Sequence, residues 1–149
     1  MTKTKLSDLG SSVCVDDRNE KTVPALGNGS AVPGDLCGIT AASGKVKGTD
    51  TGAVDEFVGI LKEDKITGTE TAIGDGIPCT LVVPQSGHNY RIRTLPDASG
   101  ATTDLEVGVG LDFSATAYKA DICADIIHAI MRLALRYVDN DEVAEVTWA

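Results

Sequence analysis

Aromatic residues are scarce in this chain of 149 residues, where they make up 4% of the sequence. We therefore expect the core to draw its volume from Val, Ile, Leu and Ala rather than from stacked rings. Long apolar runs are also missing, since none approaches the roughly 18 residues of a membrane span. No apolar stretch follows the basic amino terminus, so we expect no secretory signal. The length predicts one main domain that is large enough to bury a core.

Basic side chains are outnumbered, with 13 Lys and Arg against 22 Asp and Glu and a net charge of −9. This balance disfavours non-specific nucleic-acid binding, which depends on Lys and Arg to neutralise phosphates. It favours solubility and repulsion between unassembled copies. We therefore expect neither a nucleic acid nor a membrane as a partner.

Histidine and cysteine are too few and too widely spaced to indicate a catalytic or metal site. The only histidines are His88 and His128, and Cys123 lies five residues before the second of them, a spacing that points the two side chains in different directions on a helix and disfavours a Cys-His nucleophilic pair. The cysteines lack the close pairs of a zinc site and the density of a disulfide scaffold. We expect most of them to be buried free thiols, with disulfide pairing as the alternative; they are Cys14, Cys37, Cys79 and Cys123.

Carboxylates are numerous but fall in turns or in charged runs. Asp35, Asp75 and Asp97 each lie in a turn, where Asp usually bonds its own backbone. Asp139-Asn140-Asp141-Glu142 resembles part of a cation-binding loop but lacks the twelve-residue frame of an EF-hand, so weak surface calcium binding is only a minor alternative. Gly74-Asp75-Gly76 is not followed by the helix and Lys-Ser/Thr of a phosphate loop. The sequence therefore predicts no enzyme, no cofactor and no metal.

Short apolar runs joined by Gly-Asp or Asp-Gly turns dominate residues 32–84. Such turns reverse the chain, and β-branched residues fit the half-buried face of a sheet. A polar loop at residues 139–141 predicts a hairpin near the carboxyl end. Several short strands separated by turn residues indicate a mainly β fold, a small barrel or sandwich. The predicted strands are 36–41, 56–62, 78–83, 89–95, 105–109, 132–138 and 142–148.

Residues 120–131 depart from this strand pattern. Ile122, Ile126, Ile127 and Ile130 recur at a helical spacing, and Asp121 suits the first turn of a helix. We therefore predict one short helix here, although β-branched Ile lowers helix propensity.

The first 30 residues are polar and mixed, with few apolar positions. We interpret residues 1–30 as an extended arm, with Leu6, Leu9 and Val13 as its apolar anchors, and residues 31–149 as a β-barrel domain. A first edge strand near residues 12–15 is an equally good interpretation.

Arginine is concentrated in two of the predicted strands. Arg91 and Arg93 alternate with Tyr90 and Ile92, so both point to one face, and Arg132 and Arg136 likewise share a face. Two interpretations stay open. The arginines could pair with local Asp and Glu on a solvated face, or they could form a docking surface, since Arg is enriched at interfaces.

The order of these turns and strands resembles that of the capsid decoration, or cement, proteins of tailed viruses. The resemblance covers residues 32–83 and 132–148. It implies that the first run opens a small, β-tulip-like barrel, that the second run is a central strand, and that the third follows a turn. The runs that carry it are Pro33-Gly34-Asp35-Leu36, Phe57-Val58-Gly59-Ile60-Leu61, Ile73-Gly74-Asp75-Gly76-Ile77-Pro78-Cys79-Thr80-Leu81-Val82-Val83, Ala134-Leu135-Arg136-Tyr137-Val138 and Glu142-Val143-Ala144-Glu145-Val146-Thr147-Trp148.

The resemblance implies a virion structural protein that is made in the host cytoplasm and binds the outer surface of an icosahedral capsid, often as a homotrimer. Its partners would be the major capsid protein and other copies of itself, and residues 1–30 would be the arm that takes part in binding. The nearest alternative is a head-fibre base or a tail-associated β-domain of the virion. A small ligand-binding or cupin-like β-barrel enzyme is a further alternative.

Overall fold

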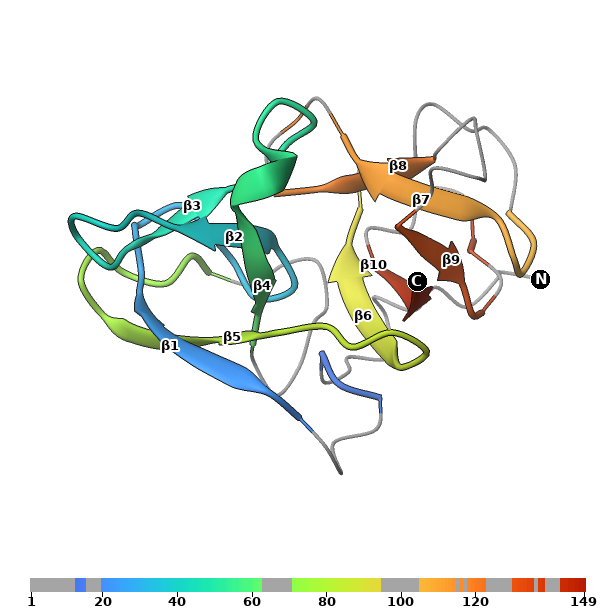
Figure 1. Ribbon diagram of the computed structural model, residues 1–149, viewed down its shortest axis with the longest axis horizontal. Coiled ribbons are helices and arrows are strands. Elements are labelled where there is room, and N and C mark those ends of the chain that lie inside the picture. Colours follow the sequence, from blue (N-terminus) through green and yellow to red (C-terminus); the bar gives the residue numbers. More distant parts are fainter. Residues whose placement is uncertain are drawn as a thin grey trace.

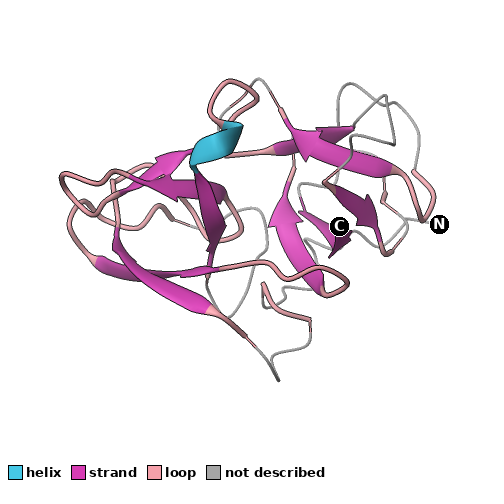
Figure 2. Ribbon diagram, in the orientation of Figure 1, coloured by secondary structure: helices cyan, strands magenta, loops and turns pink. Residues whose placement is uncertain are grey.

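The computed structural model describes residues 13–15, 20–62, 71–94, 105–114, 116, 118–122, 130–135, 137–138 and 143–149. In this part of the chain, ten strands form two antiparallel sheets of five strands each (Figures 1 and 2). One short 3-10 helix, η1 (Val54–Glu56), precedes the fourth strand. The predicted mainly β class is confirmed. Among the described residues, no helix is long and apolar enough to cross a membrane.

The first sheet contains the strands that come earlier in the chain and has the order β1-β5-β4-β2-β3. An isolated parallel bridge joins Leu26 of the edge strand β1 to Lys45, the residue just before the other edge strand, β3, so the sheet curls on itself. Curling protects the open backbone groups of edge strands from pairing with another chain. The strands are β1 (Thr22–Leu26), β2 (Leu36–Ile39), β3 (Val46–Gly48), β4 (Phe57–Leu61) and β5 (Pro78–Val82).

The second sheet has the order β6-β10-β9-β7-β8 and lies beside the first (Figure 1). A parallel bridge between Thr94, which follows β6, and Ala120 of β8 brings its two edges together as well. The strands are β6 (Asn89–Arg93), β7 (Gly110–Phe113), β8 (Ala120–Ile122), β9 (Met131–Leu133) and β10 (Val143–Trp148).

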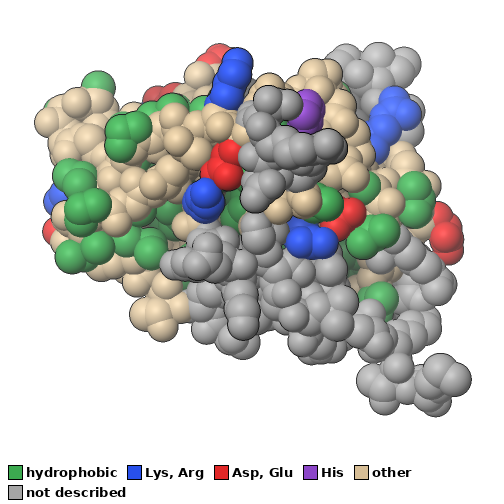
Figure 3. Space-filling model, turned by 90° about the horizontal axis from the view of Figure 1, so that it is seen from below, with side chains coloured by type: hydrophobic (Ala, Val, Ile, Leu, Met, Phe, Trp, Pro, Cys, Tyr) green, Lys and Arg blue, Asp and Glu red, His purple; other side chains and the backbone are tan. Residues whose placement is uncertain are grey.

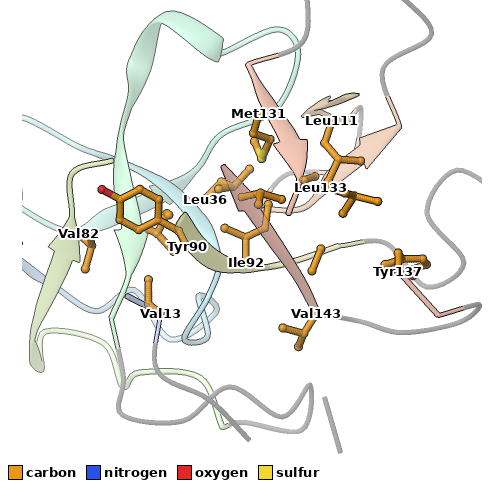
Figure 4. Close-up of a cluster of buried hydrophobic side chains, with 14 of the residues drawn as sticks. Val13, Leu36, Val82, Tyr90, Ile92, Leu111, Met131, Leu133, Tyr137 and Val143 are labelled. Carbon is orange, nitrogen blue, oxygen red and sulfur yellow. The ribbon is translucent and has the colours of Figure 1, made fainter. Parts of the chain in front are cut away.

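Consecutive apolar residues in the first sheet serve two different cores. One member of each pair packs between the two sheets and the other packs inside the curled first sheet. Because neighbouring residues of a strand point to opposite faces, the first sheet is buried on both faces at these positions. Figure 4 shows Leu36 near Ile92 and Met131 of the second sheet, and Val82 on the side of Tyr90. The pairs, all fully buried, are Leu36 and Cys37, Ile60 and Leu61, and Val82 and Leu81.

Four aromatic rings gather where the two sheets meet. Phe57 of β4 stacks on Trp148 of β10 with ring centroids 5.4 Å apart. Phe113 lies 5.2 Å from Phe57, and Tyr90 meets Trp148 edge-on at 6.4 Å. The cores are mainly aliphatic, as expected. The sequence did not predict that ring contacts would join the two sheets.

The hairpin predicted at the carboxyl end is supported by the pairing of its two strands. β9 and β10 run antiparallel, with Leu133 opposite Val146. The loop predicted at residues 139–141 falls outside the described residues.

The strand predicted at 105–109 is wrong. A turn interrupts it, in which Val109 N–H donates to the Glu106 carbonyl at 3.4 Å and Gly108 has a φ of 94°. A positive φ at the third residue of a turn favours glycine. The strand β7 begins only after this turn.

The helix predicted at 120–131 is wrong at both ends, while residues 123–129 fall outside the described part of the chain. Ala120 pairs with Phe113 and Ile122 with Leu111 in the β7–β8 hairpin. Met131 begins β9. Strand pairing overrides the helical spacing at these ends, which agrees with the preference of Ile for strands.

The predicted boundary at residue 30 does not separate an arm from the folded domain. Within the first 30 residues, β1 pairs with β5 along its whole length. Cys14 forms an antiparallel bridge with Tyr90, and Arg91 N–H donates to the Val13 carbonyl at 2.8 Å. The alternative of an edge strand near residues 12–15 therefore describes 13–15 better. Residues 1–12 and 16–19 are not described, so an arm ahead of Val13 stays a prediction.

Candidate functional site

The turn that opens β2 is held by several hydrogen bonds and ion pairs. Gly34 has a φ of 91° and its N–H donates to the Leu61 carbonyl at 2.7 Å. Asp35 is 1% exposed, and its Oδ2 accepts a hydrogen bond from Val32 N–H at 2.9 Å. The expectation that Asp35 bonds its own turn is therefore confirmed. The Gly34 carbonyl also accepts from Arg93 N–H at 2.9 Å, which ties the turn to the second sheet.

Two cations of the second sheet converge on the Asp35 carboxylate. Lys119 Nζ lies 2.6 Å from Asp35 Oδ1, and Arg93 Nε lies 3.8 Å from the same oxygen. Burial raises the pKa of Asp35 above its usual value, while Lys119 and Arg93 act to lower it. The three charged groups therefore form one ionic cluster at the seam between the sheets.

Arg91 belongs to a second ion pair, within the second sheet. Arg91 and Glu145 are cross-strand partners, and Arg91 Nη2 lies 3.0 Å from Glu145 Oε1. The side chains of Arg91 and Glu145 are 22% and 8% exposed. On the same strand pair, the Thr147 hydroxyl donates to Asn89 Oδ1 at 2.6 Å.

The structure therefore places Arg91 and Arg93 beside carboxylates of their own chain. The first interpretation was that these arginines pair with local Asp and Glu on a solvated face. The pairing is correct, but the face is not solvated, because both arginine side chains are largely buried. A docking role for these two arginines stays untested.

The other residues predicted for partner binding differ in their exposure to solvent, and some of them are not described. Arg132 is exposed on β9, opposite Thr147 of β10. Val13 is fully buried in the core between the sheets, so it is a core residue and not an anchor presented to a partner. Leu6, Leu9 and Arg136 lie outside the described residues. Among the predicted site residues that the structure describes, Arg132 is therefore the exposed one.

Sequence reasoning missed Lys119 and Glu145 as partners of the arginine and aspartate residues. Lys119 is 84 positions from Asp35, and nothing local in the sequence links them. Pairing the predicted strands at 89–95 and 142–148 end to end sets Arg91 opposite Val146, one residue away from its observed partner Glu145. The predicted strands therefore pointed to this neighbourhood but not to the exact register.

The cysteine prediction is confirmed for the three cysteines that the structure describes. Cys14 and Cys37 are buried, Cys79 is half-buried, and all three are free thiols. Burial raises the pKa of Cys79 and, more strongly, that of Cys37, which disfavours their reactive thiolate forms. Cys123 and His128 are not described. In the described ranges, His, Cys, Asp and Glu form no group of three that could hold a metal ion.

Figure 3 shows the face of the molecule that is seen from below the view of Figure 1. Hydrophobic side chains lie scattered over the left end of this face and again toward its right, and Lys, Arg, Asp and Glu side chains lie near the middle and at the edges. The large apolar side chains exposed in the described residues are Val15, Ile77, Val107 and Leu135.

Comparison of the chain with models of known protein families and with curated proteins gives no match. The fold, the ionic cluster at the seam between the sheets and the turn-and-strand pattern are therefore the features that bear on function.

Proposed function

We propose that this chain is a virion structural protein that binds the outer surface of an icosahedral capsid and stabilises contacts between subunits of the major capsid protein. One observation supports the proposal most. Of the three runs between residues 33 and 83 that carry the resemblance to capsid decoration proteins, the first leads into β2 at Leu36 and the other two contain β4 and β5. These three are adjacent strands of one curled sheet.

The positions of these strands agree with what the resemblance implies. β4, which contains Val58-Gly59-Ile60-Leu61, is the central strand of the first sheet. β5 follows a turn in which Gly76 has a φ of 76° and Ile77 N–H donates to the Gly74 carbonyl at 3.1 Å. β2 follows the Gly34 turn. A shared order of turns and strands supports a shared architecture, and the function is proposed by analogy with that architecture.

The physical character of the domain suits a clamp. Burial of the first sheet on both faces and the closure of both sheet edges favour a rigid body. Rigid modules that attach to a repeating lattice gain from several modest contacts made at once, because each later contact is effectively intramolecular. A homotrimer, which is part of the proposal, would supply three such contact surfaces.

Co-sedimentation with empty shells tests the proposal. The shells are assembled from the major capsid protein of the virus that encodes this chain. We expect the full chain to pellet with them and to saturate at a fixed ratio to the capsid subunits. A folded chain that stays in the supernatant would contradict the proposal.

The contribution of the arm needs a deletion that spares the folded domain. A chain lacking residues 1–30 would lose β1 and the buried Val13, so its failure to bind would be ambiguous. A chain lacking residues 1–12 keeps both. We expect weaker binding from this shorter deletion, and full binding would reject the arm while leaving decoration intact.

The trimer is tested separately by light scattering on the isolated chain. We expect a mass three times that of the chain of 15.5 kDa. A monomer at the concentrations used for shell binding would reject the trimer.

A further inference from the structure

Two neighbouring residues that precede β8 reach from the second sheet onto the first. Tyr118 N–H donates to the Thr49 carbonyl at 3.3 Å, and the Tyr118 carbonyl accepts from Leu36 N–H at 2.9 Å. Lys119 supplies the ion pair with Asp35 described above. We name Tyr118 and Lys119 the anchor, because they join the second sheet to β2 and to the end of β3.

The Tyr118 side chain fills space in the first sheet. It packs against the core inside that sheet, whose members include Cys37 and Leu61. Its hydroxyl accepts a hydrogen bond from Asn28 Nδ2 at 2.8 Å. The Tyr118 ring therefore packs into the core of the first sheet, although its backbone leads into β8 of the second sheet.

Two features make this contact costly to hold. Tyr118 has a φ of 77°, the only positive value among the described residues other than glycine. An L-residue with a side chain is strained there, and such strain persists only where the surroundings impose it. The ion pair with Asp35 is withdrawn from water as well, since the Lys119 and Asp35 side chains are 21% and 2% exposed. Detachment of the anchor would relax the backbone and return both charges to water.

We propose that the anchor is a detachable latch that opens in a local event while both sheets stay folded. The opening frees the turn at Asp35 and uncovers the seat of the Tyr118 ring in the first sheet. It changes how firmly the two sheets are held together, since the anchor supplies backbone, ionic and side-chain contacts between them. The inference does not depend on the proposed function.

Native-state hydrogen exchange of the full chain across a series of sub-denaturing urea concentrations tests the latch. The amides of Leu36 and Tyr118 bond across the anchor, whereas Lys62 N–H donates to the Thr80 carbonyl at 2.9 Å, within the first sheet. Local opening exposes amides without a large change in exposed surface. We expect Leu36 and Tyr118 to exchange about tenfold faster than Lys62, with little dependence on urea. Equal rates and equal urea dependence for all three amides would overturn the latch.

Substitution of Lys119 supplies a second, independent test. Lys119→Gln removes the ion pair with Asp35 and should speed exchange at Leu36 and Tyr118 several-fold while leaving Lys62 unchanged. Lys47→Gln is the matched control, because it removes an exposed pair with Glu56 at 3.1 Å elsewhere on the first sheet. No acceleration by Lys119→Gln, equal acceleration at Lys62, or the same effect from Lys47→Gln would contradict the proposal.

Discussion

Reversing the charge of Arg91 tests whether the ion pair between Arg91 and Glu145 stabilises the folded state. In the wild type, Glu145 Oε1 lies 3.0 Å from Arg91 Nη2. Arg91→Glu replaces this cation with a second carboxylate beside Glu145. Glu145 is 7% exposed, so water cannot easily solvate the unpaired charge. An exposed residue with only surface partners would tolerate the same change.

The expected loss of stability follows from the burial of the pair. Exposed ion pairs contribute about 0–1 kcal/mol, whereas removing one partner of a buried pair costs about 3–5 kcal/mol. The Arg91 side chain is 22% exposed and that of Glu145 8%, so the pair lies between these cases. We expect Arg91→Glu to lower the free energy of unfolding by about 2–4 kcal/mol. For a domain of this size, that corresponds to a fall in Tm of about 4–16 °C.

Urea and thermal unfolding measure this loss, with two controls. Arg132→Glu reverses an exposed arginine of the same sheet and should change stability by less than about 0.5 kcal/mol. The double variant Arg91→Glu with Glu145→Arg restores opposite charges and should recover part of the loss. A Tm for Arg91→Glu equal to that of Arg132→Glu would refute the reasoning. If the loss is found, Arg132→Glu becomes the clean variant for testing partner binding.

Three further results are expected. Gly59→Ala should destabilise the chain by about 2 kcal/mol or more in urea unfolding, because the added Cβ would lie 2.5 Å from the Val82 carbonyl oxygen, and a wild-type midpoint would contradict this. Because burial raises the pKa of Asp35, its folded state holds the proton more tightly than the unfolded state. The stability of the wild type relative to Asp35→Asn should therefore fall as pH rises from below 3.8 through the raised pKa, and a rise over that window would contradict the direction. With a thiol reagent and peptide mass mapping, Cys79 should react before Cys37, which is fully buried and should react only on unfolding; the reverse order would count against the burial assigned to them.

Several strands that sequence predicted well have consecutive apolar residues after a turn. β4, β5 and β10 begin and end within one residue of the predicted ranges, and β2 and β6 begin where expected. Their signals are local, since glycine-containing turns set the start and β-branched residues continue the strand. The sequence did not predict β1, β3, β7 or β8. β1 contains Pro24, which argues against a strand but is tolerated at a sheet edge.

The parts that sequence could not predict depend on long-range packing. The isoleucine spacing after Ala120 suggests a helix when taken alone, yet Ala120 and Ile122 pair with β7. The ionic cluster at the seam between the sheets also depends on long-range packing, because Asp35 meets Lys119 and Arg93 only after two sheets have formed and packed. Arginine alternation on β6 did predict that Arg91 and Arg93 share a face, but not which carboxylates would meet them.

Co-sedimentation of the full chain with empty capsid shells tests the central claim most directly. The proposed function predicts saturable binding at a fixed ratio to the capsid subunits, by chain that circular dichroism shows to be folded. A folded chain that remains in the supernatant at every concentration tested would contradict it.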